Sequence, residues 1–195
     1  MSHTQRFVMS LFVSTAPFWI APLAYSAPLT LKTEPNAPRV EFTAIGRPSA
    51  LKIKGKGAAL TPALDLDHGT LKGALEFDLT SLETGLSLRD RHMKDKYLEV
   101  ASFPKSRFEF DALKLPAAIT ESQEGESEIT VPGKLTLHGV TQPISAKAKI
   151  RKAGNVYFIE AAFALKLTQF GIEIPKFAGI TVAEDVNLDV TFETQ

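Results

Sequence analysis

Residues 81–110 read SLETGLSLRDRHMKDKYLEVASFPKSRFEF, and this is the one stretch that departs from an otherwise strand-like pattern. We expect a turn at Thr84-Gly85 and then a short charged helix or helical loop over residues 88–100. Phe103-Pro104 should end it, because proline disfavours the helical conformation in the residue before it. Alternation resumes at Arg107. A β protein with one helical excursion is therefore expected, and such an excursion is where a barrel holds its lid or its ligand contacts.

Outside this stretch, apolar and polar residues alternate. In residues 69–80, Leu71, Leu75 and Phe77 share one face while charged residues share the other. A period of two over this length is typical of a half-buried strand. The same pattern recurs in seven further segments, which are residues 39–45, 51–55, 107–113, 129–137, 144–150, 159–167 and 186–192.

Other segments mark bends and links between these strands. The phase of the alternation changes near Ala112, which predicts a bulge. Hairpin-like connections are expected at residues 139–143 and 153–155. Pro62 makes residues 57–67 ambiguous, either a loop or an edge strand. Residues 120–128 are interpreted as a solvated acidic loop.

The pattern predicts an all-β fold: an antiparallel barrel of about eight strands with one short helical excursion near residues 88–100. Closure removes strand edges that would invite aggregation. A barrel of this size holds either side chains or one small ligand. Small residues at inward positions could leave an apolar cavity, or they could interdigitate with large ones in a filled core; they are Gly73, Gly133, Ala146, Ala148 and Ala161.

Composition excludes several classes of function. The chain has 195 residues, 22 basic and 22 acidic, so nothing indicates nucleic-acid binding. It has no cysteine, which excludes a thiolate metal site and a cysteine nucleophile. His68, His92 and His138 lack metal-ligand spacing, and no hydrolase or phosphate-loop motif occurs. We therefore predict no catalytic residue, no metal site and no cofactor.

The amino-terminal residues resemble a secretory signal peptide. Arg6 precedes a mostly apolar run over residues 7–23, and Ala24-Tyr25-Ser26 offers small residues for cleavage. A membrane anchor is the alternative, but the run is short and contains two prolines, Pro17 and Pro22. We expect residues 1–26 to be a signal peptide and residues 27–195 to form one exported domain, periplasmic or secreted and not integral to the membrane.

The charged start of the helical excursion allows two interpretations. Ser87 can cap a helix whose first turn contains Asp90, and the charges can pair along the helix. Alternatively, Arg89 or Arg91 lies at a cavity mouth and binds a phosphate or another polar head group. Arg89, Asp90 and His92 are our candidates for this rim.

Three blocks of the sequence carry a family resemblance. The first is Ser81-x-x-Thr84-Gly85 with Arg89-Asp90-x-His92-Met93-Lys94, Tyr97-Leu98, Phe103-Pro104 and Phe108-x-Phe110. The second runs from Gly133 to Pro143, and the third joins Phe170-Gly171-Ile172 to residues 186–192. Together they resemble the YceI-like family of exported lipid-binding (polyisoprenoid-binding) proteins. This resemblance implies a lipocalin-like antiparallel barrel whose interior accepts a long isoprenoid or similar amphiphilic chain.

We therefore expect an exported, non-catalytic protein that holds an apolar, isoprenoid-type or fatty-acid-like lipid as carrier or buffer. The inward residues predicted to contact the ligand are Leu75, Phe77, Phe108, Phe110, Leu135, Leu137, Phe163 and Phe192. A structural or partner-binding barrel with a filled core and no ligand is the alternative, and a small hydrolase or redox accessory using His92 or His138 is a third. A homodimer is compatible with the sequence.

Overall fold

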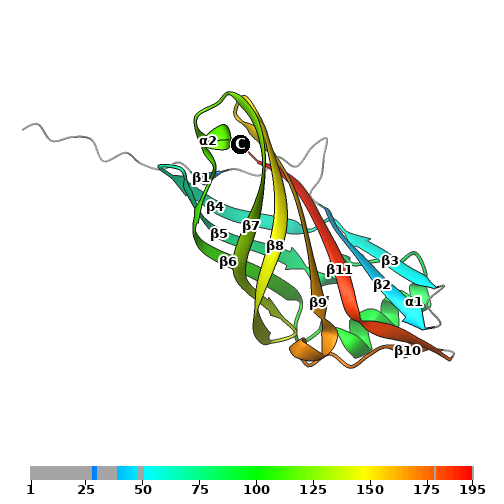
Figure 1. Ribbon diagram of the computed structural model, residues 1–195. Coiled ribbons are helices and arrows are strands. Elements are labelled where there is room, and N and C mark those ends of the chain that lie inside the picture. Colours follow the sequence, from blue (N-terminus) through cyan, green and yellow to red (C-terminus); the bar gives the residue numbers. More distant parts are fainter. Residues whose placement is uncertain (1–27, 30–38, 48–50, 178, 195) are drawn as a thin grey trace, which may run out of the picture.

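The computed structural model describes residues 28–29, 39–47, 51–177 and 179–194. The expected signal peptide, residues 1–26, lies outside the described residues. Each pair of neighbouring strands is antiparallel, and together they form one sheet that curls around its own apolar face (Figure 1). The prediction of an all-β antiparallel fold is confirmed.

The sheet order is β1-β4-β5-β6-β7-β8-β9-β11-β2-β3, with β10 paired to β11. The strands are β1 (Pro28–Leu29), β2 (Arg39–Arg47), β3 (Lys52–Gly57), β4 (Leu60–Asp67), β5 (Thr70–Asp78), β6 (Lys105–Lys114), β7 (Glu124–Leu137), β8 (Val140–Ala153), β9 (Val156–Lys166), β10 (Lys176–Phe177) and β11 (Ile180–Thr194). The helical segments are η1 (Leu79–Ser81), α1 (Ser87–His92), the π-helical turn η2 (Met93–Tyr97), α2 (Ala117–Thr120) and η3 (Leu167–Phe170).

β4 is the strand that the alternation left ambiguous, and it raises the number of long strands from eight to nine. It pairs with β5 along its whole length, with Pro62 opposite Leu75. On its other side, the described residues pair only at Leu64 and Asp65, through β1. Pro62 is therefore tolerated because it lies in an edge portion of the strand, where no ladder donor is needed.

The expected acidic loop at residues 120–128 is wrong. α2 ends at Thr120 and β7 already begins at Glu124, so Glu124, Glu126 and Glu128 belong to a strand. Two of them face basic residues of β8: Glu126 lies opposite Arg151, with its carboxylate 2.9 Å from the amine of Lys149, and Glu128 lies opposite Lys149. Cross-strand charge pairing therefore extends the β7–β8 hairpin beyond the apolar alternation.

Two tight turns and a bulge shape the strands. The β7–β8 turn is His138-Gly139, with φ of 52° and 73°, so β8 starts at Val140, earlier than expected. Two positive φ values in a two-residue loop match the right-handed twist of a hairpin. The bulge expected near Ala112 is confirmed, since Ala112 has φ of 49° and the β5–β6 register shifts between Leu71 and Gly73.

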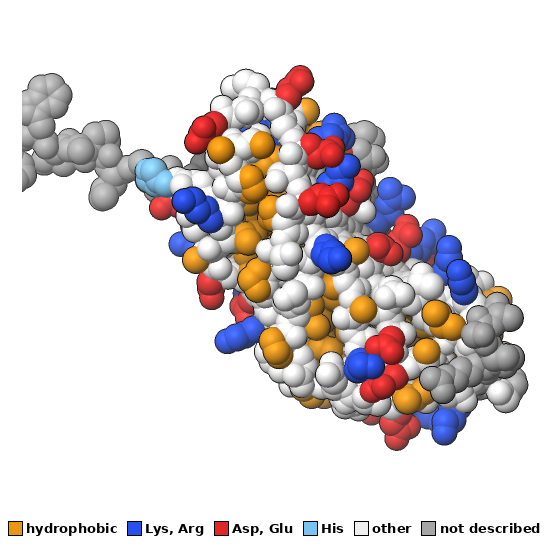
Figure 2. All heavy atoms as spheres, viewed as in Figure 1, with side chains coloured by type: hydrophobic (Ala, Val, Ile, Leu, Met, Phe, Trp, Pro, Cys, Tyr) orange, Lys and Arg blue, Asp and Glu red, His pale blue; other side chains and the backbone are white. Residues whose placement is uncertain are grey.

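β6 and β7 are paired only at three positions, from Arg107 opposite Thr136 to Glu109 opposite Lys134. Beyond these positions the two strands diverge (Figure 1). Figure 2 shows acidic and basic side chains spread over this face, with a line of hydrophobic side chains along the divergence. This outer face is thus largely polar, and hydrophobic side chains reach it where β6 and β7 separate.

Candidate functional site

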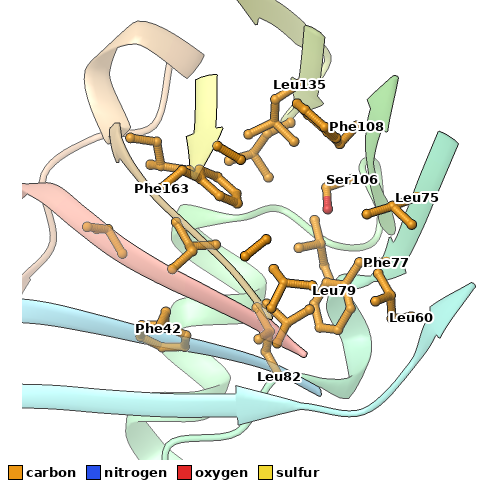
Figure 3. A pocket seen from close by; sticks show the side chains of 18 of the residues that line it. Phe42, Leu60, Leu75, Phe77, Leu79, Leu82, Ser106, Phe108, Leu135 and Phe163 are labelled. Atoms are coloured by element: carbon orange, nitrogen blue, oxygen red, sulfur yellow. The ribbon is translucent and has the colours of Figure 1, made fainter. Parts of the chain in front are cut away.

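The curled sheet encloses a cavity of about 790 Å³ (Figure 3). Its wall is built from the inward positions of β2 to β9 and β11, and nearly all of these residues are apolar. The volume lies within the roughly 300–1,000 Å³ that is usual for small-molecule sites. The inward faces of the strands therefore enclose a hollow interior and not a filled core.

All eight side chains predicted to contact the ligand line this cavity: Leu75, Phe77, Phe108, Phe110, Leu135, Leu137, Phe163 and Phe192. Five of these eight carry labels in Figure 3 and project into the same space, from β5, β6, β7 and β9. They come together because residues two apart on a strand share one face. Their contact with a ligand stays a prediction.

The glycines do not create the empty space. A Cβ on Gly133 would lie 2.5 Å from the ring of Phe108, and one on Gly55 would lie 2.2 Å from the ring of Phe42. These glycines make room for neighbouring aromatic rings to lie flat against the wall. The alanines at inward positions, Ala146, Ala148 and Ala161, are part of the cavity lining.

Several lining residues were missed in the sequence. Leu60 and Leu64 were overlooked because residues 57–67 had no assigned structure, although both are buried and line the cavity. Phe42 follows the alternation of its strand and could have been found from it. Ser106 lies two positions before Phe108 on the same face, and Figure 3 shows its hydroxyl directed into the apolar interior.

Polar side chains gather at the mouth of the cavity, where the chain passes from η1 into α1. Thr84, Ser87, Arg89 and His92 line this mouth. Arg89 donates from Nε to Thr84 Oγ1 at 2.7 Å and from Nη2 to the Thr84 carbonyl at 2.8 Å. The mouth therefore combines a cationic group with hydroxyls, next to an apolar interior.

Asp90 stabilises this turn and is not part of the cavity lining. Its carboxylate accepts hydrogen bonds from the backbone N–H of Thr84, at 2.7 Å, and from the Thr84 hydroxyl. Ser87 does not cap α1 as expected, because the helix begins at Ser87 itself and its end has no side-chain cap. Of the three rim candidates, Arg89 and His92 thus lie at the mouth, and Asp90 positions Thr84.

The end of the helical excursion is fastened to the sheet by His138. Its Nε2 lies 2.8 Å from Glu99 Oε2 and its Nδ1 lies 3.2 Å from the Phe170 carbonyl. The Phe103 ring packs against the imidazole, with centroids 4.6 Å apart. Met93 and other partly buried side chains of the excursion pack against the core. His138 therefore has a structural environment that joins three segments of the chain.

The described residues offer no metal site and no membrane-spanning helix. No group of three or more His, Cys, Asp or Glu gathers there as a metal site would require. None of the helices in the described ranges has the length and apolar character that crossing a bilayer demands. Hydrogen bonds from Thr80 lower the pKa of Asp78 below 3.8, but Asp78 caps η1 and does not line the cavity.

Comparison with known proteins gives a consistent result. A family model described as the YceI-like domain matches residues 31–194. A UPF0312 protein of Pseudomonas syringae pv. tomato is 36% identical over 126 residues, which cover 61% of this chain and 59% of that protein. Protein YceI of Salmonella arizonae is 32% identical over 99 residues, 47% of each chain. The chain thus spans less than two thirds of the length of these relatives.

Solved structures show the same fold. One is a polyisoprenoid binding domain from Saccharophagus degradans, with a TM-score of 0.66, 14% identity and coverage of 86% of this chain and 97% of that one. Another is Burkholderia cenocepacia BcnA, with a TM-score of 0.65, 14% identity and coverage of 81% and 96%. At these identities the likeness shows a shared curled-sheet architecture.

Proposed function

This chain belongs to the YceI-like family, and from that membership and the cavity we propose that it binds one apolar lipid inside its curled sheet, as a carrier or buffer and not as a catalyst. The observation that carries the proposal is the cavity of about 790 Å³ with an apolar wall. Each methylene group moved from water into such a space contributes about 0.8 kcal/mol. A long chain therefore binds without needing polar specificity.

The distribution of polar groups favours an amphiphilic ligand, such as an isoprenoid-type or fatty-acid-like lipid. Nearly all of the wall is apolar, whereas Thr84, Ser87, Arg89 and His92 lie at the mouth. The tail would occupy the interior and the head group would remain at the mouth. A guanidinium has five N–H donors, so Arg89 can hold Thr84 and also reach a carboxylate or phosphate.

We also propose that the protein is exported, to the periplasm or beyond, with residues 1–26 as its signal peptide. The charged start, the apolar run and the small residues at positions 24–26 support this proposal. Sequencing the amino terminus of the protein recovered from its host tests it directly. A terminus at residue 27 is expected, and retention of the apolar run in the mature protein would contradict it.

The test of the binding function is native mass spectrometry of protein purified gently from its own host, followed by denaturing extraction. A co-purifying apolar molecule of discrete mass is expected, and the spectrum reports its stoichiometry. Protein found without ligand should take up isoprenoids or fatty acids when incubated with them. A mass that stays unliganded after this incubation would contradict the proposal and favour a structural barrel that binds no lipid.

A further inference from the structure

The exposed large hydrophobic side chains of the described residues all lie at one end of the molecule. They are Leu86, Leu88, Leu51 and Ile45, exposed by 58%, 48%, 38% and 38%. The three leucines line the mouth of the cavity, and Ile45 lies at the same end on the outer face of β2, opposite Lys52 of β3. Figure 1 shows α1 and the adjoining ends of β2 and β3 together at this end. We call these four residues the apolar lip.

Exposed apolar side chains grouped around an opening mark an interaction site, because scattered ones would be expected anywhere on the surface. The space-filling view shows hydrophobic side chains among charged ones at the end of the molecule where Figure 1 draws α1 and β10 (Figure 2). The lip is continuous with the cavity wall through Leu51 and Leu86. Whatever covers the lip therefore meets the ligand path.

Basic residues surround the lip. Residues 51–57 and 83–96 contain seven Lys or Arg and three Asp or Glu, although the whole chain is balanced at 22 of each. Lys52, Lys54 and Lys56 project from the exposed positions of β3. Glu83 pairs with Lys56, at the end of β3 far from Leu51, whereas Lys52 and Lys54 lie opposite Ile45 and Thr43. Lys52 and Lys54 thus place positive charge next to Ile45 and Leu51 of the apolar lip.

We propose that the apolar lip docks on the surface of an anionic lipid bilayer. The leucines enter the boundary between head groups and acyl chains, while Lys52, Lys54 and Arg91 contact lipid phosphates. Docking places the mouth of the cavity against the acyl region, so an apolar tail passes between bilayer and protein without crossing water. This inference rests on the proposed lipid-binding function, because it assigns the place where the ligand is exchanged.

The experiment is co-flotation of the mature protein with vesicles of phosphatidylcholine, with and without phosphatidylglycerol. We expect binding to the anionic vesicles, weakened by added salt because exposed charges are screened. The double variant Lys52→Glu/Lys54→Glu should lower the affinity at least about tenfold, since each basic residue near an anionic surface contributes to binding. Leu86→Ser should also weaken binding. Lys134→Glu/Lys147→Glu, at exposed positions on β7 and β8, changes the net charge by the same amount, is the matched control and should bind as the unmodified protein does.

The same variants are then tested for uptake of a fluorescent fatty acid in solution. Lys52 and Lys54 do not line the cavity, so Lys52→Glu/Lys54→Glu should take up the probe normally. Three results would overturn the docking proposal and leave the lipid-binding function standing. They are lipid uptake by a protein that binds no vesicles, equal binding to neutral and anionic vesicles, and unchanged vesicle binding by Lys52→Glu/Lys54→Glu. Vesicle binding without uptake of any lipid would instead contradict the proposed function.

Discussion

Gly133 and Phe108 show at the scale of single residues how the cavity wall is made. The ring of Phe108 occupies the place that a side chain on residue 133 would need, and the carbonyl of Glu109 approaches the same point. An aromatic ring can therefore lie against the sheet and leave the centre of the barrel open. Such a pairing depends on the register of two strands, which alternation within one strand does not reveal.

This pairing predicts an energetic coupling between the two residues. Gly133→Ala should destabilise the protein by about 1–3 kcal/mol, because overpacking forces the ring and the backbone to move. In the double variant Gly133→Ala/Phe108→Leu, part of that loss should disappear, with a coupling energy of about 0.5–3 kcal/mol. Urea unfolding of the two single variants and the double variant measures it. Strictly additive losses would show that the ring does not occupy this place.

The hydrogen bonds that Asp78 accepts predict that the stability of the protein depends on pH. The Asp78 carboxylate accepts hydrogen bonds from the hydroxyl of Thr80, at 2.6 Å, and from the Thr80 backbone N–H, at 2.8 Å, and these lower its pKa below the ordinary 3.8. A carboxyl whose pKa is lowered by folding stabilises the folded state above its unfolded pKa, and this stabilisation is lost as pH falls through the folded value. The advantage of the unmodified protein over Asp78→Asn should therefore shrink as the pH falls below about 4.

Unfolding by urea at neutral and acidic pH measures that advantage. Thr80→Val removes the hydroxyl donor and keeps the backbone donor, so it should lose only part of the pH dependence. A difference in stability between the unmodified protein and Asp78→Asn that stays constant down to strongly acidic pH would contradict the assignment.

At the scale of elements, the long strands were predictable and their junctions were not. Alternation located the cores of β5 and β7, because one face of each meets the apolar interior and the other meets water. It could not assign β4, since Pro62 is compatible with both a loop and an edge strand. The turn before α1 could not be predicted either. Asp90 was interpreted through its helical neighbours, whereas its hydrogen-bond partner, Thr84, lies outside the helix.

The Thr84 turn predicts a local change in dynamics. In Asp90→Ala, the Thr84 amide loses its acceptor at 2.7 Å, and a hydrogen bond to a charged group contributes about 1.5–3 kcal/mol. Hydrogen exchange at the Thr84 amide should therefore accelerate by about tenfold or more, measured by mass spectrometry of peptides or by NMR. Asp95→Ala, an exposed position on η2, is the control and should leave this amide unchanged. Equal exchange in both variants would show that Asp90 does not hold the turn.

At the scale of the whole molecule, the sequence allowed either a hollow or a filled barrel. Alternation assigns residues to the inner face, and all eight predicted contact residues lie on the cavity wall. It does not tell how far apart opposite walls stand. That distance depends on strand pairing, and β6 and β7 pair at only three positions before they diverge. A hollow interior is thus a property of the register of the sheet and not of the composition of its inner face.

A large side chain introduced into the cavity tests whether the interior is hollow. Ala148 is buried on β8, lines the cavity and lies between Ile129 and Ala161, so Ala148→Phe directs a ring into open space. We expect lipid uptake to fall at least tenfold while the unliganded protein keeps its melting temperature within a few degrees, because a ring that enters empty space gains contacts without displacing packed atoms. Ala148→Leu, with a smaller side chain, should have a smaller effect on uptake.

The control is Ala162→Phe, at an exposed position of β9 next to Ala161 in the chain and on the opposite face of the sheet. It adds the same ring outside the cavity and should leave uptake unchanged. Fluorescent fatty-acid titration and thermal unfolding compare the three variants. A large loss of stability in Ala148→Phe with little loss in Ala148→Leu would indicate that the interior near β8 is already packed. Normal lipid uptake by a stable Ala148→Phe variant would instead show that the ligand binds elsewhere. A phenyl ring added to the cavity wall excludes part of any ligand that occupies the same volume.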